Sequence, residues 1–227
     1  GGRGGVPDAL VLVQHPPVYT LGTGSVLEHL KFDIDDPPIP IHRVERGGEV
    51  TFHGPGQLVL YPILDLKGNH TPDLHWYMRM LEETVIRALD YGVEIESGRV
   101  DGLTGVWTGA GKVAALGVRA RRWVSYHGIA LNVVVDLEPF SSIVPCGIAD
   151  KAVASVEGLL GADGPGRLDI SGGWREGSGP TGIALTRGAG GAWSPQQAAL
   201  LQLMRGELLG AFEEVFALEL VDPPEGA

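Results

Sequence analysis

Two long segments in the middle of the chain, residues 113–119 and 124–135, constrain the fold more than any other part of the sequence. From His127 to Val135, every second residue is predicted to face the same side, and after His127 all of these residues are apolar. Alternation with a period of two residues is typical of a strand that covers a core with one face. These segments therefore predict strands in the middle of a sheet.

Shorter apolar segments predict further strands around this pair. Residues 9–13 form a buried strand that ends at the His-Pro-Pro sequence, and residues 58–66 form another. Residues 41–46 show mixed alternation and are followed by two glycines, which predicts a strand, a tight turn and a second strand.

Two amphipathic helices accompany the strands. Thr71 as N-cap, followed by Pro72, predicts a helix that runs to residue 90 and ends at Gly92. Ser194, followed by a proline and by Gln197, has the pattern of a capping box and predicts a C-terminal helix. Strands followed by helices, without strict alternation, predict an α+β fold in which a sheet packs against helices.

Composition favours one compact catalytic domain. Hydrophobic residues make up 44% of the 227 residues, which is enough for a sizeable core. We predict a single domain over residues 9–220, a flexible N-terminus at residues 1–8, and a mobile glycine-rich insertion at residues 161–191.

Charge and hydropathy exclude several function classes. A formal net charge of -11 argues against a nucleic-acid binder, because that affinity rests on Lys and Arg. No apolar run is long enough to span a membrane. The single cysteine, Cys146, excludes an internal disulfide and a multi-cysteine zinc site. Cys146 is therefore either a small buried hydrophobe or a nucleophile.

Three other features are candidates for function. Lys112, between small residues and an apolar strand, is either a proton-transfer group or a solvated turn residue. Residues 46–57 contain four glycines, which either let the backbone approach an acyl or phosphopantetheine group or make two turns around a short strand. The basic cluster Arg119, Arg121 and Arg122 either docks an acidic carrier protein or consists of ordinary solvated charges.

These motifs, taken in order, resemble the lipoyl(octanoyl) transferase family. The matching text is QHPPVYTLG at 14–22, RGG at 46–48, HGPGQ at 53–57, GKV at 111–113, LG at 116–117, YHGIALN at 126–132 and PCG at 145–147. The resemblance implies a biotin/lipoyl protein ligase-like fold with no metal or other cofactor. It also implies a catalytic dyad of Cys146 and Lys112. The implied acyl-binding residues are Arg46, Gly47, Gly48, Glu49, Val50, Thr51, Phe52, His53, Ala115, Leu116, Gly117, Gly128, Ile129 and Ala130.

The resemblance further implies an activity. The family transfers an octanoyl or lipoyl group from acyl carrier protein to a lysine of lipoyl domains in 2-oxoacid dehydrogenase or glycine cleavage subunits, the first step of lipoate biosynthesis. We expect a Cys146 thioester intermediate and a monomer, in the plastid stroma, another organelle matrix or the bacterial cytoplasm. Two alternatives are an ATP-dependent lipoate or biotin ligase, which does not need Cys146, and a non-catalytic module that binds acyl carrier protein.

Overall fold

The computed structural model describes residues 8–144, 152–161 and 193–221. Its largest element is a six-stranded sheet with strand order β1-β5-β9-β8-β7-β6, in which every pair of neighbours is antiparallel. The strands are β1 (Ala9–Val13), β5 (Gln57–Ile63), β6 (Gly98–Val100), β7 (Leu103–Thr108), β8 (Gly111–Arg121) and β9 (Val124–Asn132). The segments predicted to lie mid-sheet, β8 and β9, do so, although β9 ends three residues earlier than predicted.

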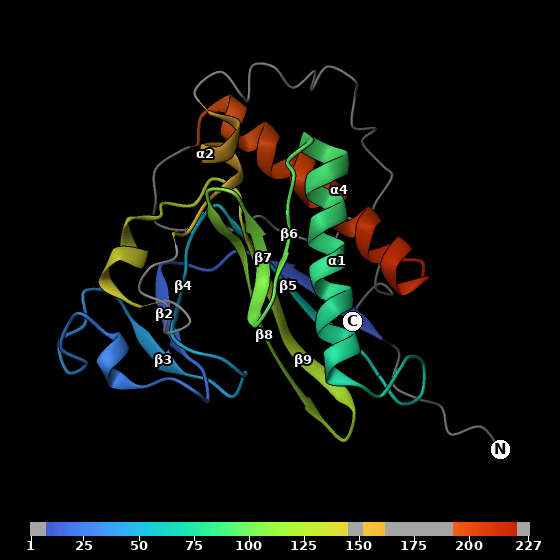
Figure 1. Cartoon of the computed structure of the whole chain (residues 1–227), viewed down its shortest axis with the longest axis horizontal. Coiled ribbons are helices and arrows are strands. Elements are labelled where there is room, and N and C mark those ends of the chain that lie inside the picture. Colours follow the sequence, from blue (N-terminus) through green and yellow to red (C-terminus); the bar gives the residue numbers. More distant parts are fainter. Residues whose placement is uncertain (1–7, 145–151, 162–192, 222–227) are drawn as a thin grey trace, which may run out of the picture.

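Two long helices cover one face of this sheet. They are α1 (Leu74–Val93) and α4 (Pro195–Phe216), and they pack against each other on one side of the sheet (Figure 1). Leu58 and Leu60 of β5 lie opposite Leu131 and Ile129 of β9, and all four belong to the core beneath the helices. Because side chains alternate along a strand, the residues between them face the other side of the sheet.

A second, three-stranded sheet faces that other side. Its order is β3-β2-β4, formed by β2 (Val18–Leu21), β3 (Ile41–Arg43) and β4 (Thr51–His53). Short 3-10 helices at Leu27–His29 and Glu138–Ser142 flank it, and α2 (Val156–Leu160) lies near the end of the large sheet (Figure 1). Tyr19, Phe52 and Phe140 form the centre of its separate core.

The predicted strand-turn-strand around Gly47 is wrong in two respects. The first strand stops at Arg43 rather than residue 46, and the second begins at Thr51. The two strands do not pair with each other, because β2 lies between them, parallel to β3 and antiparallel to β4. Arg46 to Gly48 consequently form part of a longer loop.

Both predicted helices are present, with one correction at a cap. Ser194 and Gln197 form the predicted capping box. Helix α1 begins later than predicted, because Asp73 is its N-cap and accepts hydrogen bonds from the backbone N–H groups of His75 and Trp76. The backbone carbonyl oxygen of Thr71 instead accepts a hydrogen bond from the N–H of Asp73, in a turn before the helix. The helix continues through Gly92 to Val93.

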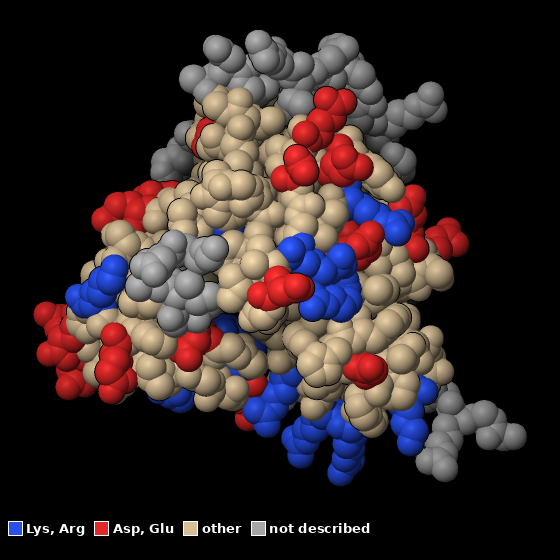
Figure 2. All heavy atoms as spheres, viewed as in Figure 1, with Lys and Arg blue, Asp and Glu red and all other residues tan. Residues whose placement is uncertain are grey.

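The basic cluster lies at one end of the large sheet. Arg121 pairs with Val124 across the β8–β9 hairpin, so that Arg122 and Trp123 form its turn. Figure 2 shows Lys and Arg side chains gathered along the lower edge of the molecule, where Figure 1 places this hairpin tip. The predicted insertion at 161–191 lies outside the described residues, except for Gly161, which follows α2. In the described part of the chain, no helix is long and apolar enough to cross a membrane.

Leu81→Ala tests the packing of α1 on the sheet. Leu81 is 0% exposed in the main core. We expect a loss of about 2–5 kcal/mol in the free energy of unfolding, because the change removes buried apolar surface and leaves a cavity. Urea unfolding measures this loss. Asp90→Ala, at an exposed position of the same helix, should change it by less than about 0.5 kcal/mol. Equal effects of the two changes would contradict this packing.

Candidate active site

A cavity of about 950 Å³ lies between the two sheets. Its walls come from β2, β4 and the loop after β3 on one side, and from β5, β8 and β9 on the other. On β5 and β9 the lining includes Val59 and Ala130, which lie opposite each other and alternate with the core residues under the helices. The face of the sheet that the helices leave uncovered therefore forms the cavity floor.

Most residues that the resemblance implies for acyl binding line this cavity. They are Arg46, Gly47, Gly48, Glu49, Val50, Thr51, His53, Ala115, Leu116, Gly117, Gly128, Ile129 and Ala130. Phe52 is not among them, because alternation along β4 turns Thr51 and His53 toward the cavity and Phe52 toward Tyr19 and Phe140. The structure thus brings these segments together, and their binding of an acyl chain stays a prediction.

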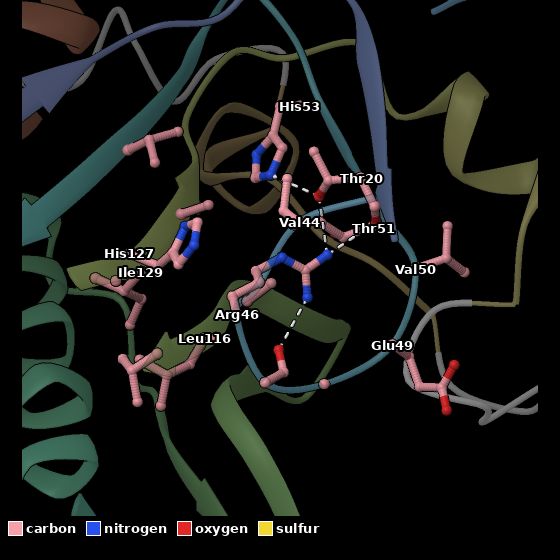
Figure 3. A pocket seen from close by; sticks show the side chains of 18 of the residues that line it. Thr20, Val44, Arg46, Glu49, Val50, Thr51, His53, Leu116, His127 and Ile129 are labelled. Carbon is pink, nitrogen blue, oxygen red and sulfur yellow. Dashed lines mark hydrogen bonds between the residues drawn. The ribbon is translucent and has the colours of Figure 1, made fainter. Parts of the chain in front are cut away.

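Arg46 lies at the centre of the cavity wall and shapes its loop (Figure 3). The side chain is only 9% exposed. Its Nη2 donates to the carbonyl oxygen of Thr20 at 2.9 Å and to Thr20 Oγ1 at 2.8 Å, and its Nη1 donates to the carbonyl oxygen of Gly47 at 3.1 Å. These bonds tie the loop after β3 to strand β2 and place a buried positive charge beside the cavity.

Gly117 allows that loop to approach the sheet. A Cβ at this position would lie 2.9 Å from Arg46 Cδ and 2.9 Å from the carbonyl oxygen of Gly47. The backbone N–H of Gly47 donates to the carbonyl oxygen of Val118 at 3.0 Å. A side chain on Gly117 would therefore push the Arg46 loop away from β8.

His53 is held by a chain of buried hydrogen bonds. Gln57 Nε2 donates to Asn132 Oδ1 at 2.9 Å and to the carbonyl oxygen of Phe52 at 3.2 Å, so Gln57 Oε1 faces His53 Nδ1, 2.7 Å away. A carbonyl oxygen only accepts, so Nδ1 carries the proton. The other ring nitrogen, Nε2, then accepts from Thr20 Oγ1 at 3.3 Å. The network assigns one tautomer to the neutral ring.

Burial keeps His53 neutral at neutral pH. It lowers the pKa of His53 from 6.5 to about 4; the hydrogen bond to Gln57 opposes this shift, and the charges of His15, Arg46 and His127 add to it. Burial also lowers the pKa of His15 and of His127, which line the same cavity. At pH 7 the three imidazoles are therefore neutral, which limits electrostatic repulsion with the buried Arg46.

Lys112 is buried in the same wall and is not a solvated turn residue. Only 6% of it is exposed, and its Nζ lies 4.7 Å from the centre of the Trp107 ring. Its backbone pairs with the chain that follows the segment of Cys146: Lys112 N donates to the carbonyl oxygen of Ala152, and Ala154 N donates to that of Lys112, both at 2.9 Å. Gly111, with φ of +145°, leaves room for Ala152.

Cys146 lies outside the described residues, but the chain is anchored on both sides of its segment. Before it, Val144 N donates to the carbonyl oxygen of His29 at 2.8 Å. The His29 ring lies 3.0 Å from the carboxylate of Glu49, which lines the cavity. After it, Ala152 bonds to Lys112. Both anchors thus lie beside the cavity.

Several cavity residues were not predicted from the sequence. Thr20, Tyr61, Met78 and His15 all contribute to the lining. His15 belongs to the QHPP motif, and Tyr61 has the same parity along β5 as Val59. Among the described residues, no group of three or more His, Cys, Asp or Glu side chains is arranged to hold a metal ion.

The low pKa of His53 predicts acid sensitivity. In the unfolded chain His53 is protonated below about pH 6.5, whereas in the folded protein it stays neutral until the pH falls to about 4. Stability should therefore fall as the pH drops from 6.5 to 4, by up to about 3 kcal/mol from this group. Urea unfolding at pH 7 and 4.5 measures the fall. The loss of stability should be smaller in His53→Gln than in the wild type. In His75→Gln, which replaces an exposed histidine on α1, it should be as large as in the wild type. An equal fall in all three proteins would contradict the assignment.

The sequence matches the model of the family "Lipoyl protein ligase A/B catalytic domain" over residues 2–167. Octanoyltransferase LIP2p2, chloroplastic, of Arabidopsis thaliana is 58% identical over 153 residues, which are 67% of this chain and 54% of that protein. An octanoyltransferase of Synechococcus elongatus is 58% identical over 66% of this chain and 64% of its own length. One of Nostoc is 46% identical over 95% of this chain and 80% of its own. The chain thus spans little more than half of the Arabidopsis protein.

Solved structures share the fold. A putative lipoate protein ligase from T. acidophilum with bound lipoic acid superposes with a TM-score of 0.65 at 16% identity, covering 96% of this chain and 76% of that one. Lipoate-protein ligase A bound with ATP gives 0.65 at 17% identity, covering 97% and 78%. These likenesses confirm the predicted α+β fold. Together with the sequence match, they show that the chain belongs to the family of lipoyl protein ligase A/B catalytic domains.

Proposed function

We propose that this protein is an octanoyltransferase that moves an octanoyl group from an acyl carrier protein to a lysine of a lipoyl domain. The observation that carries the proposal is the position of Lys112, buried in the wall of an extended cavity and bonded to residues 152 and 154. The nucleophile of the proposal, Cys146, stands six positions before Ala152. The names of the sequence relatives support the same activity.

The proposed reaction has two exchanges at Cys146. The thiolate attacks the donor thioester carbonyl, a new carbon–sulfur bond forms, and the carrier thiol leaves with a proton. The acceptor lysine amine then attacks the acyl-enzyme, an amide bond forms, and the Cys146 thiol leaves with a proton from the amine. Lys112 acts as the group that takes up and returns these protons. The donor thioester is already activated, so no ATP is consumed.

The shape of the cavity supports an acyl substrate. Val44 and Val59 contribute apolar side chains to its lining, and Figure 3 shows Val44 beside Arg46. An apolar wall binds a hydrocarbon chain by removing its surface from water, at about 0.8 kcal/mol per CH₂ group. The loop held by Arg46 forms one side of this proposed acyl site.

Two alternatives differ in a measurable way. An ATP-dependent ligase would activate free octanoate and would not require Cys146. Lipoate-protein ligase A has a similar fold, but a likeness at 17% identity shows the fold and not the activity. A non-catalytic binding module would bind the carrier and transfer nothing. The chloroplast and cyanobacterial relatives support a plastid stroma or a bacterial cytoplasm as the location.

Intact-mass analysis after incubation with octanoyl acyl carrier protein tests the proposal. We expect an added octanoyl mass on the wild type and none on Cys146→Ser. Lys112→Met keeps the aliphatic stem beside Trp107 and should slow adduct formation by about 10²-fold or more, because it removes the proton-transfer group. Adduct formation at the normal rate in either variant would refute the dyad. Product formation from octanoate and ATP, without an adduct, would favour the ligase.

Gly117→Ala tests whether the Arg46 loop forms the acyl site. The added Cβ would meet that loop, so we expect kcat/KM for octanoyl transfer to fall at least about tenfold, equivalent to about 1.4 kcal/mol. Steady-state kinetics measures the effect. Gly109→Ala adds the same atom where nothing lies within 4 Å and should leave kcat/KM unchanged. Full activity in a folded Gly117→Ala protein would exclude this loop from the site.

A further inference from the structure

An exposed basic surface lies at the tip of the β8–β9 hairpin, and we call it the basic tip. It consists of Arg119, Arg121, Arg122 and Lys67, all of them exposed. Lys67 belongs to it because its neighbour Leu66 donates its backbone N–H to the carbonyl oxygen of Trp123, at 2.8 Å. In a chain with a net charge of -11, such a concentration of positive charge selects an acidic partner.

Nearby acids do not neutralise the basic tip. Glu45 lies 3.9 Å from Arg119 and accepts a hydrogen bond from the Tyr126 hydroxyl. Asp65 accepts the backbone N–H of Gly68. These two carboxylates face four cations, and the Arg119–Glu45 pair is exposed on both sides, so it is weak. The basic tip therefore carries a net positive charge that can attract an acidic partner.

The basic tip continues the wall of the cavity. Ala115 and Gly117 line the cavity from β8, and alternation places Arg119 and Arg121 on the same face of that strand. Arg119 Nη1 also donates to the carbonyl oxygen of Glu45, the residue before Arg46, at 3.2 Å. A protein bound at the tip would therefore lie against the rim of the cavity.

Exposed apolar side chains accompany the charges. Trp123 is 39% exposed and Val124 is 41% exposed. Arg122 and Trp123 form the hairpin turn with φ of 53° and 68°, a left-handed conformation for which Asn and Gly are preferred. The hairpin thus carries an arginine and a tryptophan at positions where smaller residues would be less strained. Arg and Trp are common anchors of protein interfaces.

We propose that the basic tip docks the acyl carrier protein that donates the octanoyl group, through an acidic surface of that carrier. This inference rests on the proposed function. Arg119 is seven residues from Lys112 along β8, about 23 Å at the usual strand rise of roughly 3.3 Å per residue. A donor that holds its acyl group on a flexible prosthetic arm spans such a distance. An acceptor lysine has only its own side chain, so the lipoyl domain must bind closer to the cavity mouth.

Kinetics with two donors tests the docking surface. The double variant Arg121→Glu, Arg122→Glu is compared with Lys31→Glu, Arg87→Glu, which changes the net charge equally. Lys31 bonds to the carbonyl oxygen of Ser141, and Arg87 pairs with Glu83 and Glu214, both outside the tip. The donors are octanoyl acyl carrier protein and octanoyl-N-acetylcysteamine, a small uncharged thioester. Thermal unfolding verifies that each variant is folded.

For the tip variant we expect KM for the carrier to rise about tenfold at low ionic strength, with the effect shrinking as salt is added. Its kinetics with the small thioester should stay within about twofold of the wild type, as should both donors with the control. An unchanged carrier KM in an active tip variant would overturn the inference. A rise in KM for the lipoyl domain instead would also overturn it, since the tip would then bind the acceptor. Absence of transfer from both donors in the wild type would refute the proposed function itself.

Discussion

A line of buried and partly buried hydrogen bonds joins the two sheets and the segments that meet at the cavity. It begins at the carbonyl oxygen of Ala154, which accepts from Asn132 on β9, and passes through Gln57 on β5 to His53 on β4. From His53 it continues to Thr20 on β2 and ends at Arg46. The side chains of Gln57 and Asn132 are almost fully buried. Loss of one member would leave its neighbours unpaired, at a cost of about 1–3 kcal/mol per group.

This relay explains why segments far apart in the sequence form one site. Apolar packing holds the large sheet to its helices and the small sheet to its own core, in two separate clusters. The polar relay runs between these clusters, and because hydrogen bonds are directional, it sets how β4 and the Arg46 loop sit over β9. Its first residue, Ala154, is also the backbone partner of Lys112. The geometry of the cavity wall and that of Lys112 are thus linked.

Much of the fold was predictable because its signals are local. Alternation along β9 and the capping box at Ser194 depend on neighbours in the sequence, and both appear as predicted. The order of the small sheet was not predictable, since the pairing of β2 with both β3 and β4 is a long-range property. The cap of α1 was misplaced because Thr71 and Asp73 are both good N-cap residues and only the turn before the helix decides between them.

The candidate site shows the same difference between features set by local sequence and features set by long-range contacts. Glycines and polar residues at 46–53 marked the loop, but only the register of β4 shows that Phe52 points away from the cavity. Burial of Lys112 could not be inferred from its position after a glycine, because it depends on Trp107 and on residues 152–154, which reach it from elsewhere in the chain. Tyr61 was missed because its parity with Val59 matters only once the cavity is known to lie on that face.

Strand β8 is 11 residues long and runs from Gly111, beside Lys112, to the basic tip; it pairs with β9 in unbroken register from Ala114 to Arg121. Such a strand fixes the distance between its two ends, because its length per residue is nearly constant and its pairing with β9 resists stretching. If the tip holds the donor, the number of residues in β8 sets how long the arm of that donor must be. A family member with two residues more would keep every side chain on its present face and require an arm longer by about 7 Å. The choice of carrier would then depend on strand length as well as on charge.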